Sequence, residues 1–165
     1  MPSLLVATII RPAESRDLDA LGRMGASLMR THYLFDAQRF LSPSDGAEAG
    51  YSQFLGSQLD DSATVVMIAE VEGHVVGYVY AGVEPLSWKE LRDEAGFIHD
   101  LLVSDDARNT GVGQQLLDAA IAWLTQRGMP RVMLWTAAPN TGAQRLFERR
   151  GFRSTMVEMT LELDG

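Results

Sequence analysis

A short loop with two glycines, between a predicted strand and a predicted helix, carries the clearest chemical signal in the sequence. Gly111 and Gly113 let the backbone pass close to a ligand, and the free N–H groups of the next helical turn attract anions. Arg108 adds a positive charge. The pattern predicts a pyrophosphate-binding loop, although a plain strand-to-helix turn also uses glycine. No Lys-Ser or Lys-Thr follows the glycines, which argues against a P-loop.

A second chemical signal is the polar pair His99-Asp100 inside an otherwise apolar strand. Neighbouring residues of a strand point to opposite faces, so we expect only one of the two to face a substrate directly. A histidine ordinarily titrates near neutral pH and suits base catalysis, and a carboxylate can hold a cation. A hydrogen-bonded structural carboxylate and a structural histidine are the alternatives.

Composition narrows the class of protein that must position these residues. With 165 residues and 46% hydrophobic content, we expect a single domain over residues 1–165. The net charge of -8 argues against a nucleic-acid partner and favours a cationic substrate. The absence of cysteine excludes disulfides, thiolate metal sites and cysteine nucleophiles, and we predict no metal site.

Targeting signals are weak. The first residues are apolar but lack a basic region, so we expect a strand there and not a signal peptide. No stretch approaches the length of a membrane span, and we expect a cytoplasmic protein that does not bind membranes. The oligomeric state is open, and a homodimer is compatible with the sequence.

The first half of the chain predicts a strand, two helices and a hairpin. The strand covers Leu4 to Ile10; Ser15 then caps a helix with apolar residues at helical spacing, and Asp45 to Leu59 forms a second helix. Thr64 to Glu72 and Val75 to Val83 form a hairpin around Gly73-His74. Glu84 to Gly96 is a polar connection in which Ser87 and Glu90 suggest a capping box for a short helix.

The second half alternates strands and helices. The ranges are Phe97 to Val103 (strand), Gly111 to Gln126 (helix), Arg131 to Thr136 (strand), Asn140 to Arg150 (helix) and Phe152 to Leu163 (strand). A strand-helix-strand crossover normally gives parallel neighbours. We therefore predict an α/β fold with a mixed central sheet of about six to seven strands and helices on both faces.

Two motifs together resemble a known family. Arg108-x-x-Gly111-x-Gly113, after Leu101-Leu102-Val103, is similar to the acetyl-CoA pyrophosphate motif of the GCN5-related N-acetyltransferase (GNAT) superfamily. Asn140-x-x-Ala143-x-x-x-Phe147-x-x-x-Gly151-Phe152 resembles that family's second cofactor segment. The opening Ile10-Arg11-Pro12-Ala13 is also similar, so the resemblance spans nearly the whole chain.

The resemblance implies that acetyl-CoA is the cosubstrate and that the Phe97–Val103 and Arg131–Thr136 strands splay apart around its pantetheine arm. A backbone N–H near Leu102 or Val103 would stabilise the oxyanion of the reaction. Asn140 would contact the pantetheine arm, and its alternative role is to cap the following helix. The implied cofactor-binding residues are Leu101, Leu102, Val103, Arg108, Asn109, Thr110, Gly111, Val112, Gly113, Asn140 and Phe147.

The sequence departs from the family at Phe147, where a tyrosine commonly donates a proton to the leaving thiolate. Tyr78 or Tyr80 could replace that hydroxyl, and we select Tyr80 as a candidate catalytic residue. Similar transferases of polyamines and aminoglycosides often carry an acid at the position of Asp100. We therefore rank Asp100 above His99 as the group that holds the ammonium and relays its proton.

The expected function is transfer of an acetyl group from acetyl-CoA to a primary amine, a small cationic one. The alternatives are acetylation of a protein α-amino group or lysine, and a non-catalytic acyl-CoA-binding module.

Asp105-Asp106 is interpreted as a solvated turn. Two further groups could border the acceptor but are equally consistent with core or solvent roles: Tyr33, Phe35 and Phe40, and the acidic connection with Trp88, Glu90, Asp93 and Glu94.

Overall fold

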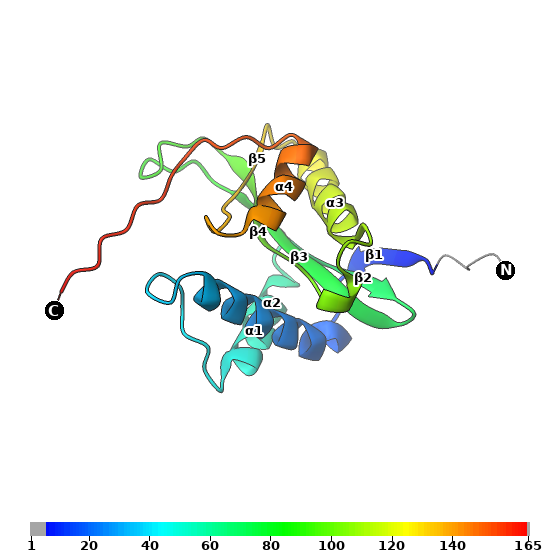
Figure 1. Cartoon of the computed structure of the whole chain (residues 1–165). Helices are drawn as coiled ribbons and strands as arrows, with labels where there is room; N and C mark the ends of the chain where they lie inside the picture. Colours follow the sequence, from blue (N-terminus) through cyan, green and yellow to red (C-terminus); the bar gives the residue numbers. More distant parts are fainter. Residues whose placement is uncertain (1–5, 165) are drawn as a thin grey trace.

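A computed structural model describes residues 6–164 and shows a five-stranded sheet with helices on both faces (Figure 1). The strands are β1 (Thr8–Pro12), β2 (Thr64–Val71), β3 (His74–Glu84), β4 (Ala95–Val103) and β5 (Val132–Leu134), in that spatial order. The helices are α1 (Leu18–Phe35), α2 (Ala47–Gln58), α3 (Val112–Gln126) and α4 (Thr141–Arg150), with short 3-10 helices at Ser15–Asp17 and Asp105–Ala107.

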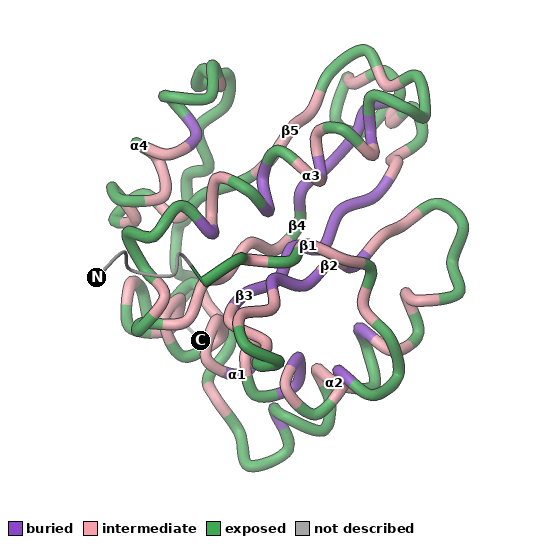
Figure 2. The backbone as a smooth tube through the Cα atoms, turned by 90° about the vertical axis from the view of Figure 1, so that its right-hand side faces the viewer, coloured by how far each residue is buried: buried purple, intermediate pink, exposed green. Residues whose placement is uncertain are grey.

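All neighbouring strands are antiparallel except β4 and β5, which are parallel because α3 connects them as a crossover. α1 and α2 cover one face of the sheet, and α3 and α4 lie on the other (Figure 1). Each face has its own apolar cluster. One joins the sheet to Leu116, Leu117, Leu124 and Phe147, and the other joins it to Leu21 and Leu55. The buried segments in Figure 2 follow the central strands.

Arg11 links three elements at the edge of the sheet. Its guanidinium lies 2.8 Å from Asp17 in the first 3-10 helix and 2.8 Å from Glu70 in β2. Asp17 is 5% exposed, and the hydrogen bonds from Arg11 hold the pKa of that carboxyl below its usual value. This buried ion pair fixes the entry of the chain into α1.

The predicted α/β class is confirmed, but the strand count is lower than the predicted six to seven. The strand predicted for Phe152 to Leu163 is absent, and residues 152–164 have no strand partner among the described residues. The alternation of this segment is strand-like, but a strand also requires hydrogen bonds to a neighbouring strand, which local alternation does not determine. β1 begins later than predicted, and Leu4 lies outside the described residues.

Two local predictions in the first half were also wrong. The hairpin turns at Glu72 and Gly73, both with positive φ (49° and 80°), and not at Gly73-His74. No helix forms between Glu84 and Gly96. Ser87 and Arg92 instead bond to each other's backbone around a tight turn, with Leu91 at φ 51°. The Ser87 hydroxyl does accept from the Glu90 N–H at 3.2 Å, so the capping pattern marks this turn and not a helix.

Candidate functional site

β4 and β5 diverge at one edge of the sheet, and this divergence was predicted. Their parallel pairing ends at Ile98↔Leu134, whereas β4 continues to pair with β3 as far as Gly77↔Val103. The β5-facing side of β4 is therefore open from His99 to Val103. Open main-chain groups on a strand can bind an extended ligand as an additional strand would.

A β-bulge in β4 changes which side chains meet at this opening. The register shifts between Tyr80↔Asp100 and Ala81↔Ile98, so His99 is an extra residue without a partner of its own. The His99 ring packs on Tyr80 at 4.9 Å between centroids, and Asp100 accepts a hydrogen bond from Tyr78. Both tyrosines belong to the cluster under α1 and α2, so His99 and Asp100 share that face. The prediction that they point to opposite faces was wrong, because strict alternation fails at a bulge.

Asp100 is held by two tyrosine hydroxyls. The Tyr51 hydroxyl of α2 donates to Oδ2 at 2.7 Å, and the Tyr78 hydroxyl of β3 donates to the same oxygen at 3.0 Å. Burial raises the pKa of Asp100, and the two hydroxyls oppose this shift in part. Burial and the Asp100 charge also raise the pKa values of Tyr51 and Tyr78, which therefore keep their protons at neutral pH. Both hydroxyls engage Oδ2, which leaves Oδ1 as the second acceptor of the carboxylate.

The helix pair positions Tyr51 through a close contact at Gly25 of α1. A Cβ at Gly25 would lie only 2.0 Å from Cδ1 of Tyr51, so the tyrosine ring occupies the space that a side chain would fill. At Gly22, one turn earlier, a Cβ would lie 2.5 Å from the backbone oxygen of Glu48. The two glycines let α2 approach α1 closely enough to bring the Tyr51 hydroxyl to Asp100.

His99 is oriented by Glu84 at the end of β3. Its Nε2 lies 3.1 Å from Oε1 of Glu84, and its ring is stacked on Phe97 at 5.8 Å. The His99 side chain is 30% exposed. The neighbouring Tyr80 hydroxyl donates to Oε1 of Gln58 at 3.0 Å, and burial raises its pKa. His99 is thus the polar side chain of the bulge that reaches the surface.

A hollow of about 190 Å³ opens beside His99. The Trp135 ring, which follows β5 and is 78% exposed, meets the edge of Phe97 at 6.0 Å. Arg92 lies over the Phe97 ring, 5.2 Å from its centroid, and pairs with Glu90 at 2.8 Å. Aromatic rings and carboxylates thus converge near the divergence of β4 and β5. The hollow is lined by Glu84, Glu90, Arg92, Phe97, Ile98, His99 and Trp135.

The glycine loop has the conformation that its residues predict. Asn109 and Gly111 have positive φ values of 60° and 88°, and α3 begins directly afterwards at Val112. The backbone N–H groups of this first turn have no intrahelical acceptor. Arg108 is half-exposed and lies 3.2 Å from Asp105, while the Thr110 hydroxyl donates to the carbonyl of Ala107. Asp105 and Asp106 are exposed, as predicted.

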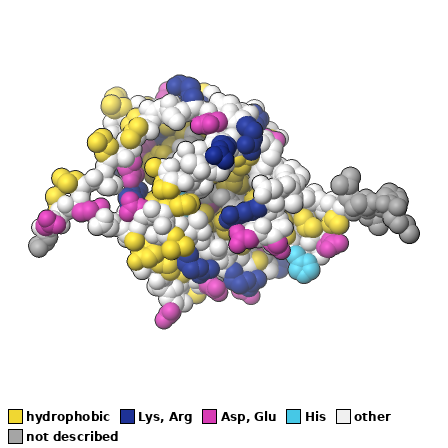
Figure 3. Space-filling model, in the orientation of Figure 1, with side chains coloured by type: hydrophobic (Ala, Val, Ile, Leu, Met, Phe, Trp, Pro, Cys, Tyr) yellow, Lys and Arg dark blue, Asp and Glu magenta, His cyan; other side chains and the backbone are white. Residues whose placement is uncertain are grey.

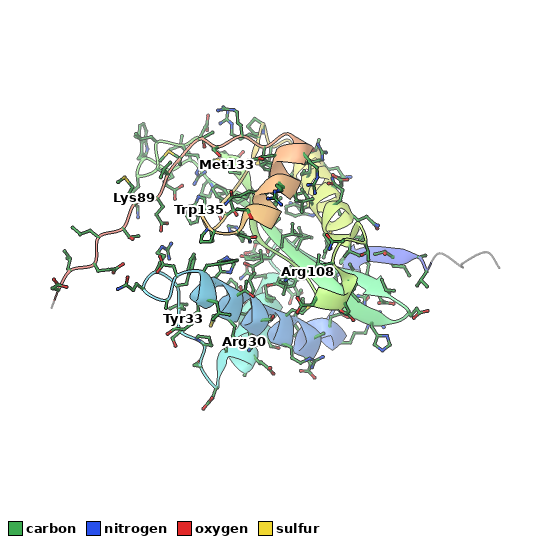
Figure 4. All side chains as sticks on the ribbon, viewed as in Figure 1. Arg30, Tyr33, Lys89, Arg108, Met133 and Trp135 are labelled. Carbon is green, nitrogen blue, oxygen red and sulfur yellow. The ribbon has the colours of Figure 1, made fainter. Side chains whose placement is uncertain are left out.

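A second hollow, of about 320 Å³, separates this loop from α1. It is bordered by Arg108 and by Arg23, Met24 and Ser27 of α1, together with Leu102 and Val103. The Ser104 hydroxyl, another lining group, is buried without a hydrogen-bond partner among the described residues. Arg23, Met24 and Ser27 were not predicted as site residues, because helical periodicity places them on a helix but does not show that they lie opposite this loop. Figure 4 shows Arg108 in this loop and Trp135 at the end of β5.

The second motif places Asn140 and Phe147 on α4. Asn140 caps the helix, with Oδ1 accepting from the Ala143 N–H at 3.2 Å, so the capping role is confirmed. Phe147 is 8% exposed and belongs to the core cluster beneath α3. Of the residues that the sequence suggested as a border of the acceptor, Phe35 and Phe40 pack on His32, while Trp88 in the acidic connection is 85% exposed.

Comparisons with known proteins identify the family that has this fold. Residues 29–152 match the model of the acetyltransferase (GNAT) family. The chain belongs to the GNAT family, and the protein is an acetyltransferase. Within residues 6–164, no helix has the length and apolar character needed to cross a bilayer, and no cluster of three or more His, Cys, Asp or Glu side chains is arranged to hold a metal ion.

Individual relatives give the same family and differ in length. The chain is 32% identical over 145 residues to the uncharacterized N-acetyltransferase YhfO of Bacillus subtilis, covering 87% of this chain and 88% of the relative. It is 36% identical over 90 residues to an uncharacterized N-acetyltransferase of Methanocaldococcus jannaschii, covering 54% of this chain but only 39% of that protein. The crystal structure of the aminoglycoside N-acetyltransferase AAC(6')-Iy in complex with CoA superimposes with a TM-score of 0.77 at 19% identity, covering 99% of both chains. At that identity the match supports the fold alone.

Proposed function

We propose that the protein transfers an acetyl group from acetyl-CoA to a small cationic amine, with both substrates bound at the same time. The hollow beside the β4–β5 divergence carries this proposal. It combines the Phe97 and Trp135 rings with the carboxylate of Glu84 and the ring of His99. Aromatic faces and carboxylates both attract an ammonium group, and a net charge of -8 favours the approach of a cation.

The residues that would hold acetyl-CoA lie along one path. The N–H groups after Gly111 face an anion-binding position at the start of α3, and Arg108 provides a cation there. From that loop the open side of β4 runs from Val103 back to His99, where it reaches the first hollow. A pantetheine arm on this edge would end beside His99. Acetyl-CoA supplies the activated acyl group as a thioester, and a CoA complex of AAC(6')-Iy supports this cosubstrate.

His99 is the proposed group that removes the proton from the acceptor. If Nε2 carries the hydrogen and donates it to Glu84, Nδ1 is left with a free lone pair for the ammonium proton. The deprotonated amine nitrogen then bonds to the acyl carbon as the carbon–sulfur bond breaks. Asp100 lies next to His99 in the bulge, and its negative charge would stabilise the imidazolium that forms. Asp100 therefore acts as a charge partner behind His99, since the Tyr51 and Tyr78 hydroxyls hold its carboxylate away from the hollow that His99 lines.

The leaving thiolate needs a proton, and Phe147 has no hydroxyl to give one. Tyr78 is fully buried with its hydroxyl directed at Asp100, which removes it from consideration. We propose Tyr80, whose hydroxyl is bonded to Gln58 and whose raised pKa keeps it protonated. A thiol with a pKa of about 8.5 is a tolerable leaving group, so this donor is expected to contribute modestly.

Three substitutions around the hollow test this assignment. His99→Asn should lower kcat/KM for the amine by about 10²- to 10⁴-fold, as for loss of a general base, while the affinity for acetyl-CoA measured by calorimetry stays unchanged. Glu84→Gln should lower kcat/KM by a smaller factor, because the His99 ring remains in place but loses its charged partner. Glu90→Gln is the matched control, since Glu90 lines the same hollow but pairs with Arg92. Normal turnover by His99→Asn would exclude His99 as the base.

A further inference from the structure

The hollow beside His99, here called the acceptor hollow, has one uncompensated negative charge. Four of its lining side chains are ionisable, and these are Glu84, Glu90, Arg92 and His99. Arg92 lies 2.8 Å from Glu90, so this pair adds no net charge to the hollow. His99 is neutral when it acts as the base of the proposed reaction, and its Nε2 lies 3.1 Å from Glu84. Among the lining side chains, the carboxylate of Glu84 is therefore left to match one ammonium group.

The guanidinium of Arg92 is engaged on several sides within the protein. Its Nε donates to Oε2 of Glu90 at 2.8 Å, and its Nη1 donates to the backbone carbonyls of Pro85 and Asp93 at 3.1 and 3.0 Å. The Arg92 side chain is 10% exposed and lies over the Phe97 ring. These contacts hold the connection between β3 and β4 as one wall of the hollow. Because its donors are used in this way, Arg92 is poorly placed to bind a carboxylate of the acceptor.

The Trp135 ring is an open aromatic surface of the acceptor hollow. Phe97 is 6% exposed, since Arg92 and His99 both pack against its ring. Trp135 lines the same hollow but is 78% exposed, and its contact with Phe97 is T-shaped, with 83° between the ring planes. Covering a large aromatic ring with an apolar group is favourable. Figure 3 shows further hydrophobic side chains at the upper left of the molecule, where the connection between β3 and β4 lies.

We propose that the acceptor is a primary amine with one positive charge and a flat apolar body, and that Trp135 and the Glu90–Arg92 pair set this specificity. The inference rests on the proposed acetyl transfer and names the class of its acceptor. The ammonium group would lie beside Glu84 and His99, and the apolar body would lie against Trp135. The second ammonium group of a diamine would gain little in this hollow, because Arg92 already compensates the charge of Glu90 and an exposed aromatic ring holds a hydrated cation weakly.

Acetyl transfer to three primary amines tests the acceptor class. Phenylethylamine has one charge and a flat apolar body, propylamine has one charge without that body, and putrescine has two charges. We expect kcat/KM from CoA release to be highest for phenylethylamine and at least about tenfold lower for putrescine. A preference for putrescine over phenylethylamine would overturn this inference and leave the proposed acetyl transfer intact. A lack of CoA release with every primary amine would overturn both.

Variants of Trp135 test the contact with the apolar body. Trp135→Ala should raise KM for phenylethylamine about tenfold and leave kcat and the KM for propylamine within about twofold of wild type. Trp135→Phe keeps an aromatic face and should retain most of the preference. Trp88→Ala is the matched control, because Trp88 is 85% exposed but does not line the hollow, and it should behave as wild type. Equal losses for both amines in Trp135→Ala would overturn the proposed contact, since the ring would then shape the hollow without touching the body of the acceptor.

A variant of Arg92 tests the charge balance. Arg92→Met removes the cation that compensates Glu90, so the hollow gains a second free carboxylate. The ratio of kcat/KM for putrescine to that for phenylethylamine should then rise at least about tenfold. Arg92→Met/Glu90→Gln makes the same change to the wall without a free carboxylate and should keep the wild-type ratio. An unchanged ratio in Arg92→Met, or an equal rise in the double variant, would overturn the role of the Glu90–Arg92 pair.

Discussion

The close approach of α1 and α2 at Gly25 makes a quantitative prediction, because it joins the packing of the helices to the site. Gly25→Ala would place a Cβ at 2.0 Å from the Tyr51 ring, well inside van der Waals contact. Overpacking of this kind costs about 1–3 kcal/mol. If Tyr51 moves away, its hydrogen bond to the Asp100 carboxylate is lost at about 1.5–3 kcal/mol. The better helix propensity of alanine offsets about 1 kcal/mol of this destabilisation. The net loss of unfolding free energy is then about 1.5–5 kcal/mol.

Gly50→Ala is the matched control, because Gly50 lies within α2 and a Cβ there meets nothing within 4 Å. The same change should stabilise the protein by about 1 kcal/mol through helix propensity alone. Denaturant unfolding of both variants measures the difference, and acetyltransferase activity of folded Gly25→Ala should fall with the loss of the Tyr51 contact. Equal stability of the two variants would refute the close packing of Tyr51 on α1.

Four further predictions follow from individual contacts. Asp100→Asn should keep both tyrosine hydrogen bonds but lower kcat/KM on the order of a hundredfold at unchanged acetyl-CoA affinity; near-normal kinetics would make this carboxylate structural. Gly113→Val should fold, since a Cβ at this position makes ordinary contacts with Leu146 and Val103 at 3.5 and 3.6 Å. The variant should bind acetyl-CoA at least about tenfold more weakly in calorimetry. Unchanged binding would mean that the pyrophosphate does not bind at this loop. Phe147→Tyr should leave the initial rate unchanged or raise it modestly, and a severe loss with intact CoA binding would contradict this. Asp17→Asn should destabilise the protein at neutral pH, because it removes the ion pair with Arg11. The pKa of Asp17 is lower in the folded protein than in the unfolded chain. The ion pair therefore contributes to stability above about pH 3.9, and this contribution disappears as the pH falls through the folded pKa. Denaturation curves with a pH-independent difference from wild type would be inconsistent with that ion pair.

The sequence predicted the elements whose residues determine their own conformation. The Gly111 loop, the Asn140 cap and the two helices after them lie where their local patterns predicted, because positive φ, capping and helical spacing are local properties. The divergence of β4 and β5 came from the family resemblance and is visible in the pairing.

The remaining differences depend on contacts between distant segments. The bulge at His99 follows from the register of β4 against β3, which no period in the sequence encodes. The hydrogen bonds from Tyr51 and Tyr78 to Asp100 join three elements. The sequence marks Asp100 as an unusual polar residue in its strand, but it does not show which hydroxyls donate to the carboxylate. Residues 152–164 alternate apolar and polar side chains as a strand does. This alternation does not show which strand, if any, the segment pairs with.

Release of free CoA in the presence of an amine panel tests the central proposal most directly. The protein has no cysteine, so a thiol reagent detects only the CoA that is released. The panel contains diamines, polyamines and aminoglycosides beside peptides with a free α-amino group or lysine. We expect acceptor-dependent release with the small cationic amines, at higher kcat/KM than with any peptide, and loss of this release in His99→Asn. Preference for a peptide would contradict the proposed acceptor class, and acetyl-CoA binding without release for any amine would show that the chain binds the cosubstrate but does not transfer the acetyl group to these acceptors.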